Sequence, residues 1–539
     1  MTMLRKDLQV MSAFNRYKAT LKLKHLSENP FDLTKEGNLN PERLSKFISK
    51  CCGFHLLYGT ERINEDTMLA LAELAEESQA LQKMEEMQTG QIVNFIDGFP
   101  SENRPVLHTA TRDIFDEPQR GNLAEEAAGM AKGEIEKLRK FMEKIDKENR
   151  FSHLIAVAIG GSDLGPKANY LALKHLTKAG RQVHFISNID PDEVAMTLKE
   201  VDLGKSLILI ISKSGTTLET VTNEAFLREQ FKKAGFEPKE HFVSISCPGS
   251  PLDNKENFLE TFYLWEWVGG RFSTSSMVGG VTLSYALGID VYMDFLQGAN
   301  AMDKTALQQD IHKNLPLLGA LLGIWNRNFL QFPALAVIPY SQALARYAAH
   351  IQQVDMESNG KRIDQHGKPA DFETGPLIIG EPGTAAQHSF YQELHQGTDI
   401  TPLEFIGFKE SQYGEDFSLN NTSSQQKLMA NLFAQAVALA TGKSSDNPNK
   451  VFPGNRPSHI LFAKKLTPYT LGALLAYFEH KVAFQGFIWG INSFDQEGVQ
   501  LGKELANKII ERFAARQDKN MRSKPYPIGD AFLNFLNEL

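Results

Sequence analysis

The segment SKSGTT, residues 212–217, follows the apolar run SLILII and gathers groups that could bind a phosphate. Gly215 allows a ligand to approach the backbone, and the next residues have a helical pattern whose N-terminus would attract an anion. A polar turn with a capping threonine and a solvated lysine has the same composition. The strand, loop and helix together favour an anion site. Its side chains supply hydroxyl donors and one positive charge: Ser212, Lys213, Ser214 and Thr217.

A second segment, AIGGSDLGP at residues 158–166, follows another apolar run and contains Gly160, Gly161 and Ser162. Glycines at this place would let a ligand reach backbone N–H groups at the start of a helix. The segment matches neither the GxGxxG fingerprint nor the P-loop. Because a tight strand-to-helix turn needs the same residues, this signal is weak when taken alone.

Two charged residues stand at the ends of predicted elements. Arg271 follows two glycines after the run FYLWEW, and a guanidinium at a strand end can stabilise an oxyanion. Glu357 falls in the last turn of a predicted helix that ends near Gly360. The negative end of a helix dipole disfavours a carboxylate, which hints at a functional base. Taken separately, each pattern favours the plain alternative, a solvated arginine at Arg271 and an exposed glutamate at Glu357.

The segment GTAAQHSFYQELHQGT contains His388 and His395, which are about two helical turns apart. The sequence offers no third ligand beside them, so we predict no metal site. A proton-donating and a purely structural role are both open for His388. Further along, Gln496 and Lys503 flank two glycines, where a helix–turn–helix with a solvated lysine is the plain alternative.

The elements that must position these residues alternate between apolar runs and helical patterns. Continuous apolar runs are typical of strands buried on both faces of a parallel sheet, and their alternation with helices predicts doubly wound α/β units. We expect strands at 154–160, 183–187, 206–212, 242–246 and 262–267, and again at 334–340, 376–380, 403–408 and 459–463.

The predicted fold class is therefore α/β, with two doubly wound parallel-sheet domains, added N-terminal helices and a C-terminal helical tail. Thr467 and Pro468 are typical of a helix start. The predicted organisation is a helical segment at 1–115, a first α/β domain at 116–288, a helical connection and second α/β domain at 289–510, and a tail at 511–539. Within residues 289–510, the second α/β unit itself is expected at about 320–510.

Composition limits the function classes. The 539 residues carry a formal net charge of −8, which argues against nucleic acid or an anionic membrane as a partner. Three cysteines, Cys51, Cys52 and Cys247, are too few and poorly spaced for a disulfide framework or a zinc site. The N-terminus lacks an apolar signal region, and the apolar runs are too short to span a bilayer. We therefore expect a cytoplasmic protein.

Considered in order, these segments closely resemble the glucose-6-phosphate isomerase family from about residue 103 to residue 503. The family is built from two sugar-isomerase domains in a homodimer. The resemblance implies reversible conversion of glucose 6-phosphate to fructose 6-phosphate through a cis-enediol, in glycolysis and gluconeogenesis, with no cofactor. The matching segments are NRPVLHTATR, AIGGSDLGP, SKSGTT, GGRFS, MESNGK, QHSFYQELHQGT and INSFDQEGVQLGK.

The resemblance also implies a role for each candidate residue. Glu357 would move a proton between C2 and C1, and Arg271 would stabilise the enediolate. His388 would open the sugar ring from the neighbouring subunit of the dimer, with Lys503 assisting. The implied contacts to the sugar phosphate are Gly161, Ser162, Ser212, Lys213, Ser214, Thr217, Gln353 and Gln496.

The chain departs from the family pattern in three segments near the expected pocket. It has SKSGTT where SKTFTT is common, Ala385-Ala386 before Gln387, and STSS where a tryptophan is common after Arg271. The first change is expected to loosen the loop. An isomerase that also accepts mannose 6-phosphate therefore stays open. A non-catalytic sugar-phosphate-binding regulator is disfavoured because the catalytic residues are present, and a dehydrogenase lacks GxGxxG.

Overall fold

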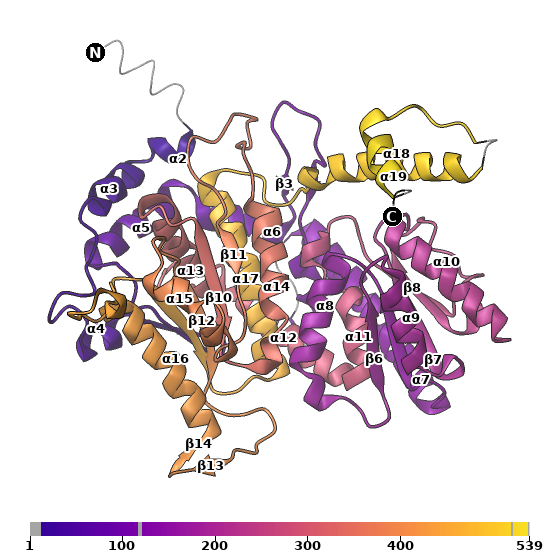
Figure 1. The fold of residues 1–539 in the computed structure, drawn as a ribbon, viewed down its shortest axis with the longest axis horizontal. Helices are drawn as coiled ribbons and strands as arrows, with labels where there is room; N and C mark the ends of the chain where they lie inside the picture. The colour runs from indigo at the N-terminus through magenta and orange to yellow at the C-terminus, as the bar shows by residue number, and fades with distance from the viewer. Residues whose placement is uncertain (1–11, 117–120, 519–520, 537, 539) are drawn as a thin grey trace. The chain divides into compact units, whose positions relative to one another are not determined.

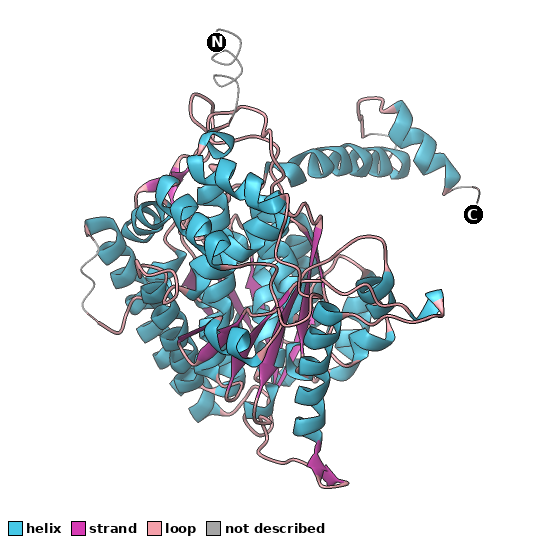
Figure 2. Ribbon diagram, turned by 90° about the vertical axis from the view of Figure 1, so that its left-hand side faces the viewer, coloured by secondary structure: helices cyan, strands magenta, loops and turns pink. Residues whose placement is uncertain are grey.

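The computed structural model describes residues 12–116, 121–518, 521–536 and 538 (Figure 1). The chain forms two compact units, one that extends to Ser493 and a smaller one at Phe494–Leu539. The larger unit contains two separate β-sheets with helices around them, and Figure 2 shows the strands enclosed by helices.

The first sheet is fully parallel, with strand order β6-β5-β7-β8-β9. Every residue of β7 is buried, as expected for a strand covered on both faces. Val194, Leu227 and Phe231 of the neighbouring helices pack on one face of the sheet. Four predicted strands are confirmed: β5 (His153–Val157), β6 (Gln182–Ile186), β7 (Ser206–Ile211) and β8 (Phe242–Ser246). The fifth, predicted at 262–267, exists but lies earlier in the chain, as β9 (Glu260–Tyr263).

Helices connect these strands and continue into the linking region. The first-sheet helices are α7 (Asn122–Glu148), α8 (Gly161–Ala172), α9 (Pro191–Glu200), α10 (Leu218–Lys233) and α11 (Met277–Leu287). The linking helices are α12 (Ile289–Thr305) and α13 (Leu315–Ile324), as the predicted helical connection requires.

The second sheet has the order β1-β2-β15-β12-β10-β11. Its four predicted strands are confirmed and parallel: β10 (Ala334–Pro339), β11 (Leu377–Ile379), β12 (Leu403–Phe408) and β15 (Ser458–Ala463). The helices that accompany them are α14 (Tyr347–Gln352), α15 (Tyr391–Gln396), α16 (Ser424–Thr441) and α17 (Pro468–Trp489). A short hairpin, β13 (Ser418–Leu419) with β14 (Thr422–Ser423), precedes α16 and projects from the body in Figure 1.

The other edge of the second sheet corrects the prediction that residues 1–115 are helical. β1 (Ile48–Cys51) and β2 (Phe54–Leu57) form a hairpin, and β2 pairs antiparallel with β15. The turn residues Cys52 and Gly53 both have positive φ, which gives the tight hairpin turn. The second sheet is therefore mixed, because the N-terminal segment contributes two of its strands.

The rest of the N-terminal segment contains the predicted helices. They are α2 (Ala13–Arg16), α3 (Lys18–Ser27), α4 (Pro41–Lys46), α5 (Glu65–Glu77) and α6 (Ala80–Thr89), followed by the small pair β3 (Ile92–Asn94) and β4 (Arg104–Pro105).

Helix α17 begins as predicted, with Thr467 as N-cap in a reciprocal capping box and Pro468 in the first turn. It is buried along nearly its whole length, and yet it carries the charged sequence Glu479-His480-Lys481 in its middle. Glu479 accepts a 2.7 Å hydrogen bond from buried Arg112, and Lys481 pairs with Glu404 of β12. These pairs neutralise charges that would be costly if buried alone.

The C-terminal unit consists of α18 (Gln500–Gln517) and α19 (Pro527–Phe535). The predicted terminal helix is confirmed, and Arg512 of α18 donates to Asp530 of α19 at 2.7 Å. Three apolar side chains of α19 are exposed: Ile528, Phe532 and Phe535. Within the described ranges, no helix combines the length and apolar character that crossing a bilayer requires.

Candidate active site

The connections of the first sheet change direction between β5 and β7. The chain leaves β5 toward β6 on one side and leaves β7 toward β8 on the other. In doubly wound sheets, ligands bind at the carboxyl ends of the strands at such a switch point. The two loops that follow these strands are AIGG at 158–161 and SKSGTT at 212–217, so the two anion-binding candidates lie at one place.

The SKSGTT loop is closed by its own hydroxyl groups. Ser212 Oγ lies 2.9 Å from Thr217 Oγ1 and accepts the backbone N–H of Gly215 at 3.1 Å. Thr216 donates from both its backbone and its hydroxyl to Ser214 Oγ, at 3.2 and 2.9 Å. Thr217 is the N-cap of α10, but its side chain makes no capping bond. The hydroxyl groups therefore organise the loop itself.

Gly215 has a backbone conformation that residues with a side chain rarely adopt. Its φ is +69°, a left-handed conformation that glycine adopts without strain. A Cβ at this position would lie 2.9 Å from Cδ of Pro251. The backbone of this loop therefore requires glycine, and a phenylalanine would need a different loop conformation.

Lys213 turns toward the segment after β9. Its Nζ donates to the carbonyl oxygens of Glu266 at 2.8 Å and Val268 at 3.0 Å, and lies 3.3 Å from the Glu266 carboxylate. Burial and the nearby Arg104 lower the pKa of Lys213. The ammonium group thus ties the SKSGTT loop to the loop that leads to Arg271.

The glycine loop after β5 packs directly on the segment that carries Arg271. A Cβ on Gly161 would lie 2.3 Å from the carbonyl carbon of Gly270, so a larger residue does not fit. A Cβ on Gly160 would lie 3.5 Å from Nε2 of Gln353. The next residue, Ser162, is partly exposed at the start of α8. Three predicted site segments therefore meet around two glycines.

Arg271 is fully buried and connects separate parts of the larger unit. Its Nε donates to Ser358 Oγ at 2.7 Å, and its Nη2 donates to the carbonyl oxygen of Ser493 at 2.6 Å. Its Nη1 lies 3.5 Å from Oε2 of Glu357. The guanidinium is thus fixed beside the candidate base, which rejects the solvated-loop alternative for Arg271.

Glu357 ends a π-helical segment, Gln353–Glu357, that continues α14. Single π-turns within α-helices are frequent at functional sites. Glu357 keeps 23% of its side chain exposed, whereas its neighbours Ser358 and Asn359 are fully buried. A half-open carboxylate on a fixed helix end, next to a buried cation, is suited to repeated proton transfer.

Two buried residues that the sequence did not single out hold this helix end. Asn359 donates to the carbonyl oxygen of Val482 on α17 at 3.0 Å and accepts from Ser493 Oγ at 2.7 Å. Ser358 accepts from Arg271. Both directly follow Glu357 in the segment MESNGK, so their position next to the candidate base was the signal that could have identified them.

His388 lies apart from this cluster. It ends the short 3-10 helix Ala385–His388 and is exposed, while its neighbour Gln387 donates to the hydroxyl of Tyr340 at 2.7 Å. His395 instead bonds to Gln435 at 2.7 Å, which indicates a structural role. The larger unit therefore presents His388 on its surface.

Gln496 and Lys503 belong to the C-terminal unit. Gln496 precedes a 3-10 turn at Glu497–Val499, and Lys503 is exposed in the first turns of α18. The larger unit thus brings together the two loops, Arg271, Gln353 and Glu357, but not these two residues.

Comparison with known proteins identifies the family. The sequence pattern of the phosphoglucose isomerase family matches residues 57–524. The chain is 60% identical over 527 residues to a glucose-6-phosphate isomerase of Protochlamydia amoebophila (strain UWE25), and the match covers 98% of each of the two chains. It is 53% identical over 489 residues to that of Chlamydia pneumoniae, covering 91% of this chain and 93% of the relative.

A solved structure has the same fold over nearly the whole length. The crystal structure of a glucose-6-phosphate isomerase from Chlamydia trachomatis D/UW-3/Cx superposes with a TM-score of 0.93 at 48% identity. The match covers 98% of this chain and 99% of the other. On these matches, together with the two-sheet fold, the chain belongs to the phosphoglucose isomerase family.

Proposed function

We propose that this chain interconverts D-glucose 6-phosphate and D-fructose 6-phosphate, as the names of its relatives indicate. The observation that carries the assignment is the 3.5 Å approach of Arg271 Nη1 to Glu357 Oε2, beside the loops of the first-sheet switch point. An aldose–ketose isomerase needs one base that removes a proton from carbon and returns it to the neighbouring carbon. Glu357 is the residue placed for that role.

In the proposed mechanism, Glu357 removes the proton from C2 of the open-chain aldose. The electron pair forms the C1–C2 double bond, and the carbonyl oxygen becomes an enediol oxygen. Arg271 stabilises the negative charge on the enediolate oxygens because it is fixed in a buried place before the reaction begins. Glu357 then returns the proton to C1, the hydroxyl on C2 passes its proton to the oxygen on C1, and C2 becomes the ketone carbonyl carbon. Reversal regenerates the aldose.

The sugar phosphate is assigned to the switch point of the first sheet. The hydroxyl groups of Ser212, Ser214 and Thr217 and the N-terminus of α10 supply donors there. Gly161 and Ser162 line the same place, and Gln353 positions the sugar beside Glu357. Because Lys213 Nζ is bound to two backbone carbonyl groups, we assign it to holding the loop. Binding energy from the phosphate orients the reacting carbons.

Ring opening needs a proton donor that the larger unit does not place beside Glu357. We propose a homodimer in which His388 of one subunit reaches the active site of the neighbouring subunit. Lys503 and Gln496 complete that active site. The exposure of His388 on the surface supports this assignment. The exposed apolar face of α19 supports docking of the C-terminal unit on a partner subunit.

A cytoplasmic location and a place in glycolysis and gluconeogenesis are part of the same proposal. All three cysteines are free, as suits a reducing compartment. The sequence-based division at residues 115, 288 and 510 also stays a prediction.

The test is turnover of glucose 6-phosphate by the purified full chain in excess EDTA, with fructose 6-phosphate coupled to a downstream enzyme. Mannose 6-phosphate is run in parallel. We expect fast, chelator-resistant turnover of glucose 6-phosphate alone. Comparable turnover of both aldoses would indicate dual specificity, and tight binding without turnover would indicate a regulator.

A further inference from the structure

The second sheet has a switch point equivalent to that of the first sheet. The chain leaves β10 toward β11 on one side, whereas β12, on the other side of β10, leads on to β15. The connections therefore diverge between β10 and β12. The rule that places ligands at the carboxyl ends of β5 and β7 applies equally to the carboxyl ends of β10 and β12.

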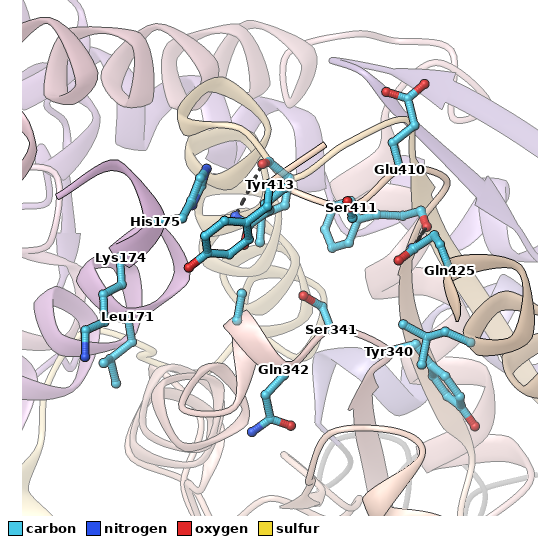
Figure 3. A pocket seen from close by; sticks show the side chains of 15 residues that line it. Leu171, Lys174, His175, Tyr340, Ser341, Gln342, Glu410, Ser411, Tyr413 and Gln425 are labelled. Carbon is cyan, nitrogen blue, oxygen red and sulfur yellow. Dashed lines mark hydrogen bonds between the residues drawn. The ribbon is translucent and has the colours of Figure 1, made fainter. Parts of the chain in front are cut away.

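A cavity of about 390 Å³ lies at this second switch point. It is lined by the loop after β10, which contains Tyr340 and Ser341, and by the loop after β12, which contains Ser411 and Tyr413. Ligand pockets typically enclose about 300–1,000 Å³, so the space suits a small molecule. Figure 3 shows Ser341 and Gln425 with their polar ends toward the middle of the pocket.

The cavity is separate from the candidate active site. Its third wall is the C-terminal end of α8 and the turn beyond it, with Leu171, Lys174 and His175. The N-terminal end of α8 carries Gly161 of the active site. Twelve helical residues span about 18 Å, so the two places lie at opposite ends of one helix.

The charges around the cavity are unbalanced in favour of an anion. The carboxylate of Glu410 turns outward in Figure 3 and has Lys464 Nζ 3.7 Å away. Lys174 has no ion-pair partner among the described residues. Burial and the nearby charge of Lys465 lower the pKa of His175, whose buried Nδ1 has no hydrogen-bond partner among the described residues. This wall thus offers one unmatched ammonium and one neutral imidazole.

The opposite wall offers hydroxyl and amide groups. The side chains of Ser341 and Gln342 have no hydrogen-bond partner among the residues that the structure describes. The Gln425 amide donates to the Phe408 carbonyl at 2.6 Å, which fixes it and leaves its oxygen as an acceptor. Gln412 donates to the Ala172 carbonyl at 2.8 Å and thereby occupies a carbonyl group at the end of α8. Such groups match the hydroxyls of a polyol.

From this arrangement we infer that the cavity between the β10 and β12 loops is a second binding site, for a small phosphorylated polyol. The phosphate lies toward Lys174 and His175, and the polyol hydroxyls lie toward Ser341 and Gln425. The ligand chemistry follows from the residues of the cavity, so the inference does not depend on the isomerase reaction.

The test is equilibrium dialysis of the full chain with D-glucitol 6-phosphate, which has no carbonyl group and is not isomerised. We expect two equivalents bound per chain. Lys174→Glu should abolish binding of one equivalent, because it places a negative charge where the phosphate is expected to bind. Binding of the other equivalent, at the active site, shows that the variant is folded. Lys140→Glu, an exposed lysine on α7, is the matched control and should retain two.

A second variant separates the two sites. The double variant Ser212→Ala, Thr217→Ala should weaken ligand binding at the active site. It should still bind one equivalent, at the site that Lys174→Glu disrupts. Inorganic phosphate should bind the Lys174 site at least about tenfold more weakly than glucitol 6-phosphate, because it lacks the hydroxyl contacts. One equivalent in the unmodified chain, two in Lys174→Glu, or equal affinity for both probes would overturn the inference.

Discussion

Arg271 Nη1 lies 3.5 Å from Oε2 of Glu357. The arginine belongs to the loop after β9 of the first sheet, and the glutamate belongs to the helix that follows β10 of the second sheet. The candidate base and the candidate electrostatic stabiliser are therefore supplied by different sheets. Their approach depends on correct packing of both sheets in one unit, and the buried hydrogen bonds of Ser358 and Asn359 help to fix it.

Replacement of Glu357 by Gln should remove the base and keep its shape. We expect kcat to fall by about 10²–10⁴, with KM changed little, because the phosphate contacts lie elsewhere. Steady-state kinetics in both reaction directions measure this. Glu373→Gln, an exposed glutamate of the same unit, is the control and should have unmodified kinetics. Normal turnover by Glu357→Gln would reject it as the base.

Replacement of Arg271 by Lys keeps the charge but cannot reproduce the three-way contact with Ser358, Ser493 and Glu357. Loss of a fixed stabilising group typically costs about 10²–10³ in kcat. We expect a loss of that size, measured at saturating glucose 6-phosphate. Ser358→Ala should have a smaller effect, since it removes one acceptor and leaves the guanidinium. A larger effect for Ser358→Ala than for Arg271→Lys would contradict the assigned role.

The proposed contribution of His388 across a dimer can be tested with two inactive variants. Glu357→Gln and His388→Ala are expressed with different tags, and the mixed dimer is purified. If each site takes Glu357 from one subunit and His388 from the other, one of the two sites in the mixed dimer is intact. We expect about half of the wild-type activity per dimer. A mixed dimer as inactive as its parents would place both residues in one subunit.

Asp355, in the π-helical segment, should make stability depend on pH. Burial raises the pKa of Asp355 to about 7, against the opposing charge of Lys481, and its Oδ1 has no hydrogen-bond partner among the described residues. An unfolded aspartate has a pKa of about 3.9. Between these values the folded state binds more protons, so the stabilising contribution present below pH 4 is lost as pH rises through 7.

Asp355→Asn should remove this dependence because it mimics the protonated form. At pH 8 we expect the variant to be more stable than the unmodified chain by about 1–3 kcal/mol, and at pH 4 nearly equal to it. Unfolding by urea at both pH values measures the difference. Burial also raises the pKa of Glu479 to about 7, so part of the pH dependence of the free energy of unfolding remains in both proteins. Lower stability of the variant at pH 8 would contradict the prediction.

The sequence predicted most strands of the two sheets because apolar runs, such as those of β7 and β10, alternate with helical patterns along the chain. It missed the β1–β2 hairpin, whose four-residue strands, ISKC and FHLL, are too short to show a period. The burial of the charged triplet of α17, Glu479-His480-Lys481, was also not predicted. Its burial depends on Arg112 and Glu404, which are far away along the chain.

The candidate site could be predicted as a set of segments but not as a geometry. The lysine of SKSGTT illustrates the limit, because its partners are backbone carbonyl groups of Glu266 and Val268 that no side-chain pattern reveals. The left-handed backbone at Gly215 and its closeness to Pro251 likewise have no signal in the sequence. The contact of Arg271 with Glu357 required the relative placement of two sheets.

The pairing of β2 with β15 has a consequence for synthesis of the chain. In the same region the Thr60 hydroxyl bonds to the Ser458 carbonyl, across 398 positions. At about 5–20 residues per second, a ribosome needs about 20–80 s to deliver β15 after β2 has emerged. During that time the hairpin has an open edge that carries Phe54 and Leu56, and exposed edges promote association of chains. The unpaired edge of β2 thus makes the nascent chain susceptible to association with other chains until β15 has been made.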